Sequence, residues 1–178
     1  MDTKDVAALF FESMAYRFAA LKDLGDKALA QLEDADLYWA PGEESNSIAV
    51  IIQHLHGNML SRWTDFLTSD GNKPWRDRDG EFDPTKNFSR DELMRRWDEG
   101  WACLTNAIQA LGPEDLTKEV TIRGQALGVI DAIERQLSHY AYHVGQLVFL
   151  ARMRRGAQWQ TLSISRGASQ SYTPTKRD

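Results

Sequence analysis

The stretch SIAVIIQHLHGNMLSRWTDFL, residues 47–67, decides the fold of this chain. Its apolar residues recur every three or four positions, which is the spacing of one face of an α-helix. These residues are Ile48, Ile51, Ile52, Leu55, Met59, Trp63 and Phe66. Ser47 precedes them and is a favourable N-cap, because its hydroxyl can accept a hydrogen bond from an amide of the first turn. We therefore predict a helix from Ser47 to about Thr68 with one apolar face.

Three other segments have the same periodicity and extend this pattern over most of the chain. They cover residues 3–32, 89–111 and 126–155. A Ser-x-x-Glu capping box opens the third predicted helix, and a Gly-Pro pair follows its last apolar residue. The fourth predicted helix is apolar on nearly all sides, which is typical of a buried helix. We therefore expect four helices, of which the last is the most apolar and is buried.

The connection between the second and third predicted helices, SDGNKPWRDRDGEFDPTKNF (residues 69–88), is long and polar. Segments of this length without secondary structure are uncommon in compact domains unless they are functional or cross the molecule. In a bundle, such a connection lets two consecutive helices run parallel instead of turning straight back. Residues 120–123 alternate well enough for a short extended piece. The sequence therefore predicts an all-α four-helix bundle over residues 1–165, followed by an irregular tail over residues 166–178.

The composition argues against several classes of protein. Of the 178 residues, 21 are basic and 26 acidic, which gives a net charge of −5, so a nucleic-acid backbone would be repelled. No apolar run approaches the roughly 20 residues that a membrane span needs. The first residues, MDTKDVAALF, lack the basic start and apolar middle of a secretory signal. The single cysteine, Cys103, cannot form an intramolecular disulfide and suits a reducing compartment. We therefore expect a cytoplasmic protein with neither nucleic-acid nor membrane partners.

Two histidines on the fourth predicted helix have the spacing of metal ligands. His139 and His143 are four residues apart, so one helical face carries both rings, with Cβ atoms about 6 Å apart. Two imidazole nitrogens at this spacing can reach one ion at about 2.0–2.1 Å. The residues between them exclude the HExxH motif of zincin proteases. The alternative for this pair is one histidine that is hydrogen-bonded in the core and one that is solvated.

A third ligand has to come from a neighbouring helix, and the second predicted helix offers His54 and His56. At about 100° per residue, His56 lies roughly 70° from the centre of the apolar face and His54 roughly 130° from it on the other side. Hydrophobicity alone favours His56, whereas a site at the flank or end of the bundle favours His54. The residues by themselves leave both histidines open.

The stretches SIAVIIQHLHGNMLSRWTDFL (47–67), RQLSHYAYHVGQLVFLA (135–151) and WQTLSI (159–164) resemble the DinB-like, YfiT-like superfamily of bacterial proteins, often called metal-dependent hydrolases. Within it, the chain is similar to an uncharacterised family. The similarity extends from about residue 5 to residue 165. It implies a four-helix bundle with up-down-down-up topology, which agrees with the long connection. It also implies a homodimer, because relatives in the superfamily commonly dimerise.

The metal triad of that superfamily is one histidine from the second helix and a histidine pair on the fourth. In this sequence those positions match His54, His139 and His143, so the resemblance favours His54 and leaves His56 as the alternative ligand. Better-understood relatives, bacillithiol S-transferases and mycothiol-dependent maleylpyruvate isomerase, bind a low-molecular-weight thiol at a zinc or nickel ion. The isomerase has glutamate in place of the first histidine of the pair, and this chain departs from it there.

Three histidine ligands leave a divalent ion with an open coordination position, as in catalytic zinc sites. Such an ion can lower the pKa of a bound water for hydrolysis or bind a thiol as thiolate. Asn58, Arg62 and Gln136 share the faces of the histidines and are candidates to orient ligands or contact a small-molecule substrate, with structural hydrogen bonding as their alternative. The sequence therefore predicts a metal-dependent enzyme, a thiol S-transferase or a hydrolase. The alternative is a non-catalytic metal-binding or dimerising helical module.

Overall fold

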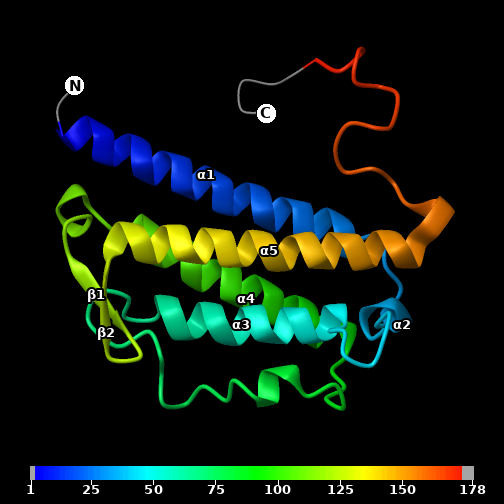
Figure 1. Ribbon diagram of the computed structural model, residues 1–178, viewed down its shortest axis with the longest axis horizontal. Coiled ribbons are helices and arrows are strands. Elements are labelled where there is room, and N and C mark those ends of the chain that lie inside the picture. Colours follow the sequence, from blue (N-terminus) through cyan, green and yellow to red (C-terminus); the bar gives the residue numbers. More distant parts are fainter. Residues whose placement is uncertain (1–2, 174–178) are drawn as a thin grey trace.

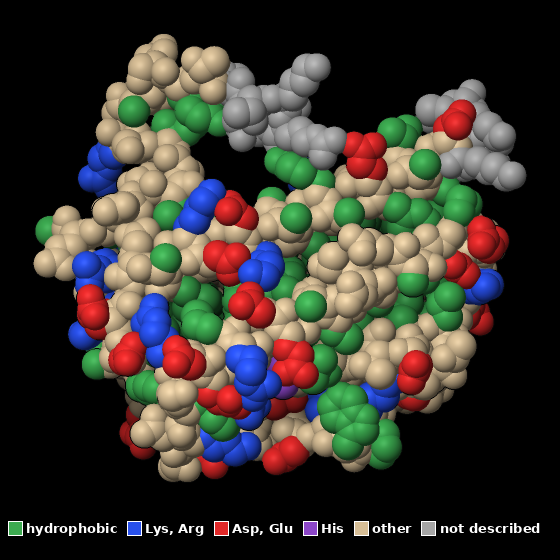
Figure 2. All heavy atoms as spheres, turned by 180° about the vertical axis from the view of Figure 1, so that it is seen from behind, with side chains coloured by type: hydrophobic (Ala, Val, Ile, Leu, Met, Phe, Trp, Pro, Cys, Tyr) green, Lys and Arg blue, Asp and Glu red, His purple; other side chains and the backbone are tan. Residues whose placement is uncertain are grey.

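The computed structural model describes residues 3–173 and is a bundle of four long helices (Figure 1). These are α1 (Thr3–Leu29), α3 (Ile48–Trp63), α4 (Arg90–Gln109) and α5 (Val129–Arg155). The shorter elements are α2 (Asp34–Leu37), the 3-10 turns η1 (Gly80–Phe82), η2 (Pro113–Asp115) and η3 (Gly156–Gln158), and the strands β1 (Glu119–Ile122) and β2 (Gln125–Gly128). The predicted fold class is confirmed. Residues 1–2 and 174–178, the latter the end of the predicted tail, lie outside the described residues. Within residues 3–173, no helix is long and apolar enough to cross a bilayer. Figure 2 shows acidic and basic side chains interspersed over one face of the molecule.

Two consecutive helices, α3 and α4, run in the same direction, opposite to α1 and α5 (Figure 1). The contacts between them follow this order. His56 Nε2 lies 3.0 Å from the Glu99 carboxylate, and further along both segments Thr64 Oγ1 lies 3.7 Å from Cys103 Sγ. A Cβ on Gly100 would lie 3.4 Å from the His56 Cα, so the two backbones approach closely. Parallel neighbours of this kind need the long polar connection that the sequence contains.

The starts of α3 and α4 agree with the prediction, whereas α1 ends at Leu29 instead of Leu32 and two further helix limits differ. Ser47 and Ser89 both cap their helices, and each accepts a hydrogen bond from an amide of the first turn. α3 ends at Trp63 instead of near Thr68, because Asp65 has a φ of 50°, which lies outside the helical range. α5 begins later than predicted, because β2 occupies the residues before it.

β1 and β2 form an antiparallel hairpin where the sequence predicts only a short extended piece. Ile122 pairs with Gln125, so the loop consists of Arg123 and Gly124, with φ of 56° and 72°. Positive φ at both positions is typical of a type I′ turn. Asp70 accepts hydrogen bonds from the amides of both turn residues, at 2.9 and 2.7 Å. This side chain stabilises the left-handed conformation of Arg123 and joins the start of the long connection to the hairpin.

The far end of the connection is held by a tyrosine that follows α2. The Tyr38 hydroxyl donates to the Phe88 carbonyl and accepts from the Phe88 amide, both at 2.6 Å. The segment between α3 and α4 is therefore fixed against the bundle close to both of its ends, although it contains only one turn of 3-10 helix, η1.

α3 is the most enclosed of the four long helices. Of its 16 residues, 13 are buried. It is covered by α4, by α5, and by α2 and η1. The expectation that the last helix is buried on nearly all sides is wrong, because one side of α5 faces solvent. The apolar residues exposed there are Ile130, Tyr142, Phe149 and Met153.

A buried tyrosine connects α5 to α3 through two hydrogen bonds. Tyr140 donates from its hydroxyl to Asn58 Oδ1 at 3.0 Å and accepts from Trp63 Nε1 at 2.9 Å. Its side chain is fully buried and contacts the Phe18 and Trp101 rings. Burial raises the pKa of the Tyr140 hydroxyl, so it remains a donor at neutral pH.

We expect Tyr140→Phe to lower the free energy of unfolding by about 2 kcal/mol or more, because Trp63 Nε1 and Asn58 Oδ1 would both stay buried without a partner. Urea unfolding followed by circular dichroism measures the change. Tyr142→Phe is the matched control, since Tyr142 is 62% exposed, and it should change stability by no more than about 0.5 kcal/mol. Equal losses in the two variants would contradict this role of the hydroxyl.

Candidate metal centre

α3 and α5 bring three histidines to one point of the bundle. α3 contributes His54, and α5 contributes His139 and His143, which lie about one helical turn apart. The Nε2 atoms of His54 and His139 are 3.2 Å apart, and those of His143 and His139 are 3.1 Å apart. The predicted histidines therefore form one cluster, whose ligand atoms all lie within 4.8 Å of one another.

The cluster is largely withdrawn from solvent. His54 is 4% exposed and His143 is 7% exposed, while His139 is partly buried. Burial, followed by the proximity of the other histidines, lowers the pKa of His139 to about 3 and that of His143 to about 4. At neutral pH these two imidazoles are therefore neutral, which is the form that binds a metal.

Hydrogen bonds on the far side of two rings fix the position of their protons. His54 Nδ1 lies 2.9 Å from the Glu81 carboxylate, and His143 Nδ1 lies 2.9 Å from Gln146 Oε1. Both partners are acceptors, so each Nδ1 carries the proton of its ring. The Nε2 atoms of His54 and His143 consequently present lone pairs toward His139.

This arrangement fits a divalent ion. A tetrahedral ion with nitrogen ligands at about 2.0–2.1 Å places those nitrogens about 3.3–3.4 Å apart. The distances of 3.2 and 3.1 Å from His139 Nε2 are close to this spacing. A proton on His139 Nε2 can form a linear hydrogen bond with only one of the two facing lone pairs. An ion shared by the three nitrogens pairs all of them, so the donor set and the two distances from His139 suit it.

The acceptor for His54 comes from the connection between α3 and α4 and is itself held by an arginine. Arg76 donates from Nε and Nη2 to the two carboxylate oxygens of Glu81, at 2.7 and 2.8 Å, and both side chains are buried. Burial alone would raise the pKa of Glu81, but the hydrogen bonds from Arg76 and His54 outweigh it and lower the pKa below its ordinary value. Glu81 is therefore an anion at neutral pH, able to hold the proton on His54.

Sequence patterns do not identify Glu81, Arg76 or Gln146. Gln146 follows His143 by three residues, so helical spacing is a usable signal for it. Glu81 and Arg76 lie in a segment without periodicity, and the only signal for them is indirect. Gly57 sits in the middle of α3, where glycine is unfavourable, and a Cβ there would overlap the Glu81 carboxylate. The glycine thus makes room for Glu81 to reach His54.

The three residues predicted beside the histidines lie one to two helical turns from them along α3 and α5. Asn58 accepts from Tyr140, Arg62 donates from Nη1 to the Gly71 carbonyl, and Gln136 lines a small void next to Arg62. In the described part of the chain, the hydrogen bonds of the cluster go to Glu81, to Gln146 and among the histidines, and none goes to these three residues.

Arg62 is a buried cation near the cluster. Among residues 3–173 it forms no ion pair with a carboxylate. Burial, and then the charge of Arg76, lowers the pKa of Arg62 to about 10, so it stays charged at neutral pH. Both guanidinium groups contribute to the lowered pKa of His139. Arg62 therefore adds positive charge near the cluster, while the charge of Arg76 is balanced by Glu81.

His56 lies outside the cluster. Its Nε2 lies 3.0 Å from the Glu99 carboxylate on α4, and its ring lines a separate cavity. Within the described residues, the group that can hold a metal contains His54 and not His56. The geometry therefore agrees with His54, the ligand that the family resemblance favours, and not with His56, the ligand that hydrophobicity alone favours.

Comparison with known proteins assigns the chain to a family. A search of the curated proteins finds no match. A family model with the description "Protein of unknown function (DUF1572)" matches residues 5–168, a range that contains the three clustered histidines, Glu81 and Gln146. Since this match spans nearly the whole chain, the protein belongs to the DUF1572 family.

Proposed function

We propose that this protein binds one divalent ion on His54, His139 and His143 and is a metal-dependent enzyme. The observation that carries the proposal is the convergence of three Nε2 atoms, with acceptors on the opposite side of two of the rings. Structural zinc sites take four protein ligands, whereas catalytic sites take three and keep one position open. Within residues 3–173 this cluster has three ligands. Imidazole nitrogens suit zinc or nickel.

An ion held there would supply a Lewis acid that makes a coordinated water or thiol more acidic. The chain prepares the site for that chemistry. Glu81 and Gln146 keep the protons of their histidines on Nδ1, so the Nε2 atoms stay available. The charge of Arg62, which has no carboxylate partner within residues 3–173, favours a substrate with negative charge. We therefore infer a thiol S-transferase or a hydrolase that acts on an anionic small molecule.

Membership of the DinB-like, YfiT-like superfamily is part of the same proposal. It is supported by the parallel pair α3 and α4, and by the match of His54, His139 and His143 to the metal triad of that superfamily. A cytoplasmic location also belongs to the proposal, supported by the free thiol of Cys103.

Protein exposed to zinc or nickel and then desalted should retain about one ion per chain. His139→Ala removes the ligand between the other two and should abolish this binding, whereas His56→Ala should retain it. Inductively coupled plasma mass spectrometry gives the stoichiometry. Stoichiometric metal in His139→Ala would refute the site. A loaded protein that retains its ion but catalyses neither thiol transfer nor hydrolysis would favour the non-catalytic module.

Glu81→Gln should weaken metal binding by about 10- to 100-fold, because the acceptor that holds the His54 proton loses its charge. Competition with a metal chelator measures the affinity, and circular dichroism establishes that the variant is folded. Glu99→Gln is the matched control, since Glu99 is the acidic partner of the histidine outside the cluster. Equal affinities for Glu81→Gln and the unchanged protein would show that the carboxylate does not support the site.

The metal-free protein should lose stability as the pH falls from about 6.5 toward 4. The folded-state pKa values of His139 and His143, about 3 and about 4, lie below the unfolded value, so the unfolded chain binds more protons in this interval. Each histidine then steepens the pH dependence by up to about 1.4 kcal/mol per pH unit. Urea unfolding of chelated protein at several pH values measures the slope. The double variant His139→Leu/His143→Leu should have a shallower slope, and an unchanged slope would contradict the burial of neutral rings.

A further inference from the structure

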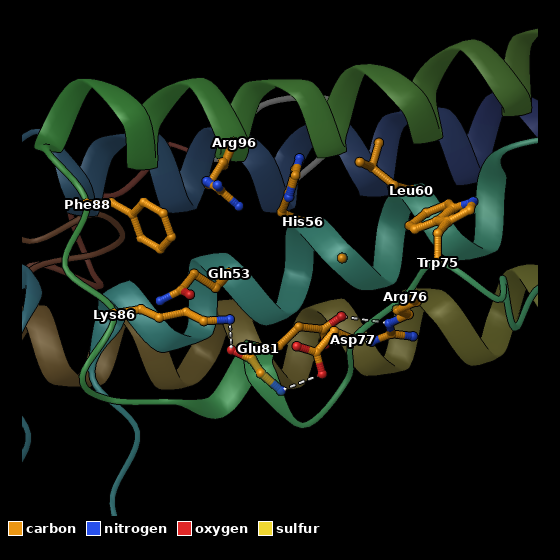
Figure 3. Close-up of a pocket in the computed structure, with 12 residues that line it drawn as sticks. Gln53, His56, Leu60, Trp75, Arg76, Asp77, Glu81, Lys86, Phe88 and Arg96 are labelled. Carbon is orange, nitrogen blue, oxygen red and sulfur yellow. Dashed lines mark hydrogen bonds and ion pairs between the residues drawn. The ribbon is translucent and has the colours of Figure 1, made fainter.

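A cavity of about 230 Å³ lies against another face of α3 than the metal centre (Figure 3). It is open to solvent on one side and is lined by α3, by α4 and by the connection between them. Its chemistry depends on Gln53 from α3, Lys86 and Phe88 from the connection, and Arg96 from α4. The three histidines of the metal centre do not line it. We refer to this space as the Gln53 cavity.

Gln53 is a buried donor with no acceptor. It is 5% exposed, and within the described part of the chain its Nε2 has no hydrogen-bond partner. By contrast, the Asn58 amide oxygen and the Ser61 hydroxyl, on the same helix, are paired. Leaving a buried amide without an acceptor is unfavourable, and an apolar side chain of similar size would avoid that cost. The nitrogen itself is inaccessible to solvent, but Gln53 lines the cavity, so rotation of its terminal amide would bring the nitrogen to an acceptor that a ligand supplies there.

Two cations line the same cavity from different elements. Lys86 Nζ donates to the Gly80 carbonyl at 2.6 Å and, among the residues that the structure describes, forms no ion pair. Arg96 donates from Nε to Glu92 at 2.9 Å, and its guanidinium lies 4.3 Å from the centre of the Phe88 ring. Figure 3 shows Lys86 and Arg96 approaching the cavity from opposite sides. Together with the Gln53 amide, they favour a ligand with negative charge.

Apolar surface lies beside these donors. Phe88, Leu60 and the exposed indole of Trp75 line the cavity. We propose that the Gln53 cavity binds a small molecule in which a carboxylate is attached to an aromatic group. The carboxylate accepts from the Gln53 amide and pairs with Lys86, and the aromatic group packs beside Phe88.

Two acidic groups also lie in the wall of the cavity. Glu81 is neutralised by Arg76, and Asp77 accepts from the Gly80 amide at 2.9 Å. Both carboxylates line the cavity. Asp77 offsets part of the positive charge of Lys86 and Arg96 for any anion, so charge alone does not separate a carboxylate from a phosphate. An aromatic carboxylate also buries apolar surface against Phe88 and Leu60, which inorganic phosphate cannot do. The chemistry of the wall therefore favours an aromatic carboxylate over inorganic phosphate.

The Gln53 cavity and the metal centre share a wall but are separate sites. Glu81 and Arg76 line the cavity, and the Glu81 carboxylate also holds His54. Binding in the cavity requires no metal, so it is tested on chelator-treated protein. If benzoate does not bind in the Gln53 cavity, the proposed metal site is unaffected. If the protein binds no metal, the proposed ligand site in the Gln53 cavity is unaffected.

Benzoate is the probe, because it is a carboxylate on an aromatic ring. Its titration into the ¹⁵N-labelled full chain should shift the side-chain amide resonances of Gln53 and saturate with a Kd on the order of 1 mM. Gln53→Leu should weaken binding about tenfold or more, while its thermal midpoint should not fall, because an unpaired amide is replaced by an apolar group. Lys86→Met should also weaken binding. Lys118→Met removes a cation next to the hairpin, paired with Asp115, and should leave binding unchanged.

The neutral isostere benzamide should bind at least about tenfold more weakly than benzoate, because it lacks the charge that Lys86 attracts. Absence of a saturable shift up to about 20 mM benzoate would overturn the site. Unchanged affinity in Gln53→Leu, or equal losses in Lys86→Met and Lys118→Met, would also overturn it. A response to inorganic phosphate as strong as that to benzoate would overturn the assignment to carboxylates.

Discussion

Burial of α3 on nearly every side is the constraint on which the rest of the structure depends. A helix in that position cannot leave its polar side chains to water, so they need partners from other elements. α5 supplies a hydroxyl to Asn58, while the connection supplies a backbone carbonyl to Ser61 and Arg62 and a carboxylate to His54. The long connection is therefore part of the interior chemistry of the bundle. Within residues 3–173, Gln53 Nε2 and Arg62 Nε on this helix have no partner, and Gln53 also lines a cavity, which indicates a ligand.

The helices and the irregular connection contribute different parts of the metal centre. Two packed helices set the spacing of the three Nε2 atoms, because the positions along a helix are fixed by its geometry. The connection and one further helical residue set the protonation of the rings, through Glu81 and Gln146. Ligands supported in this way need little reorganisation when an ion binds, which is the condition for a site that holds its geometry through a reaction. The same division explains why a single glycine, Gly57, is needed inside an otherwise well-formed helix.

Periodicity in the sequence predicts the four long helices, the two serine caps and the histidine pair, because each of these depends on residues within one helix. The choice between His54 and His56 is different. It depends on what packs against α3, and the angular positions of the two residues do not contain that information. Glu81 cannot be predicted from the sequence for a related reason: it lies 27 residues from His54, in a segment without periodicity. The exposed side of α5, which includes Phe149, shows that the apolar content of a helix does not reveal which of its sides have neighbours.

The connection is attached to the bundle at Asp70, at Glu81 and at Phe88, through the hairpin, His54 and Tyr38. The conformational entropy lost on closing a loop grows with the logarithm of its length. Each attachment shortens the loop that remains, so it lowers the entropy cost of forming the next attachment. The segment is therefore expected to order and to open as one cooperative unit. Opening it removes the carboxylate from His54 and leaves the imidazole free to exchange its proton between Nδ1 and Nε2. Chain entropy in an irregular segment thus governs the tautomer of a ring buried inside the bundle.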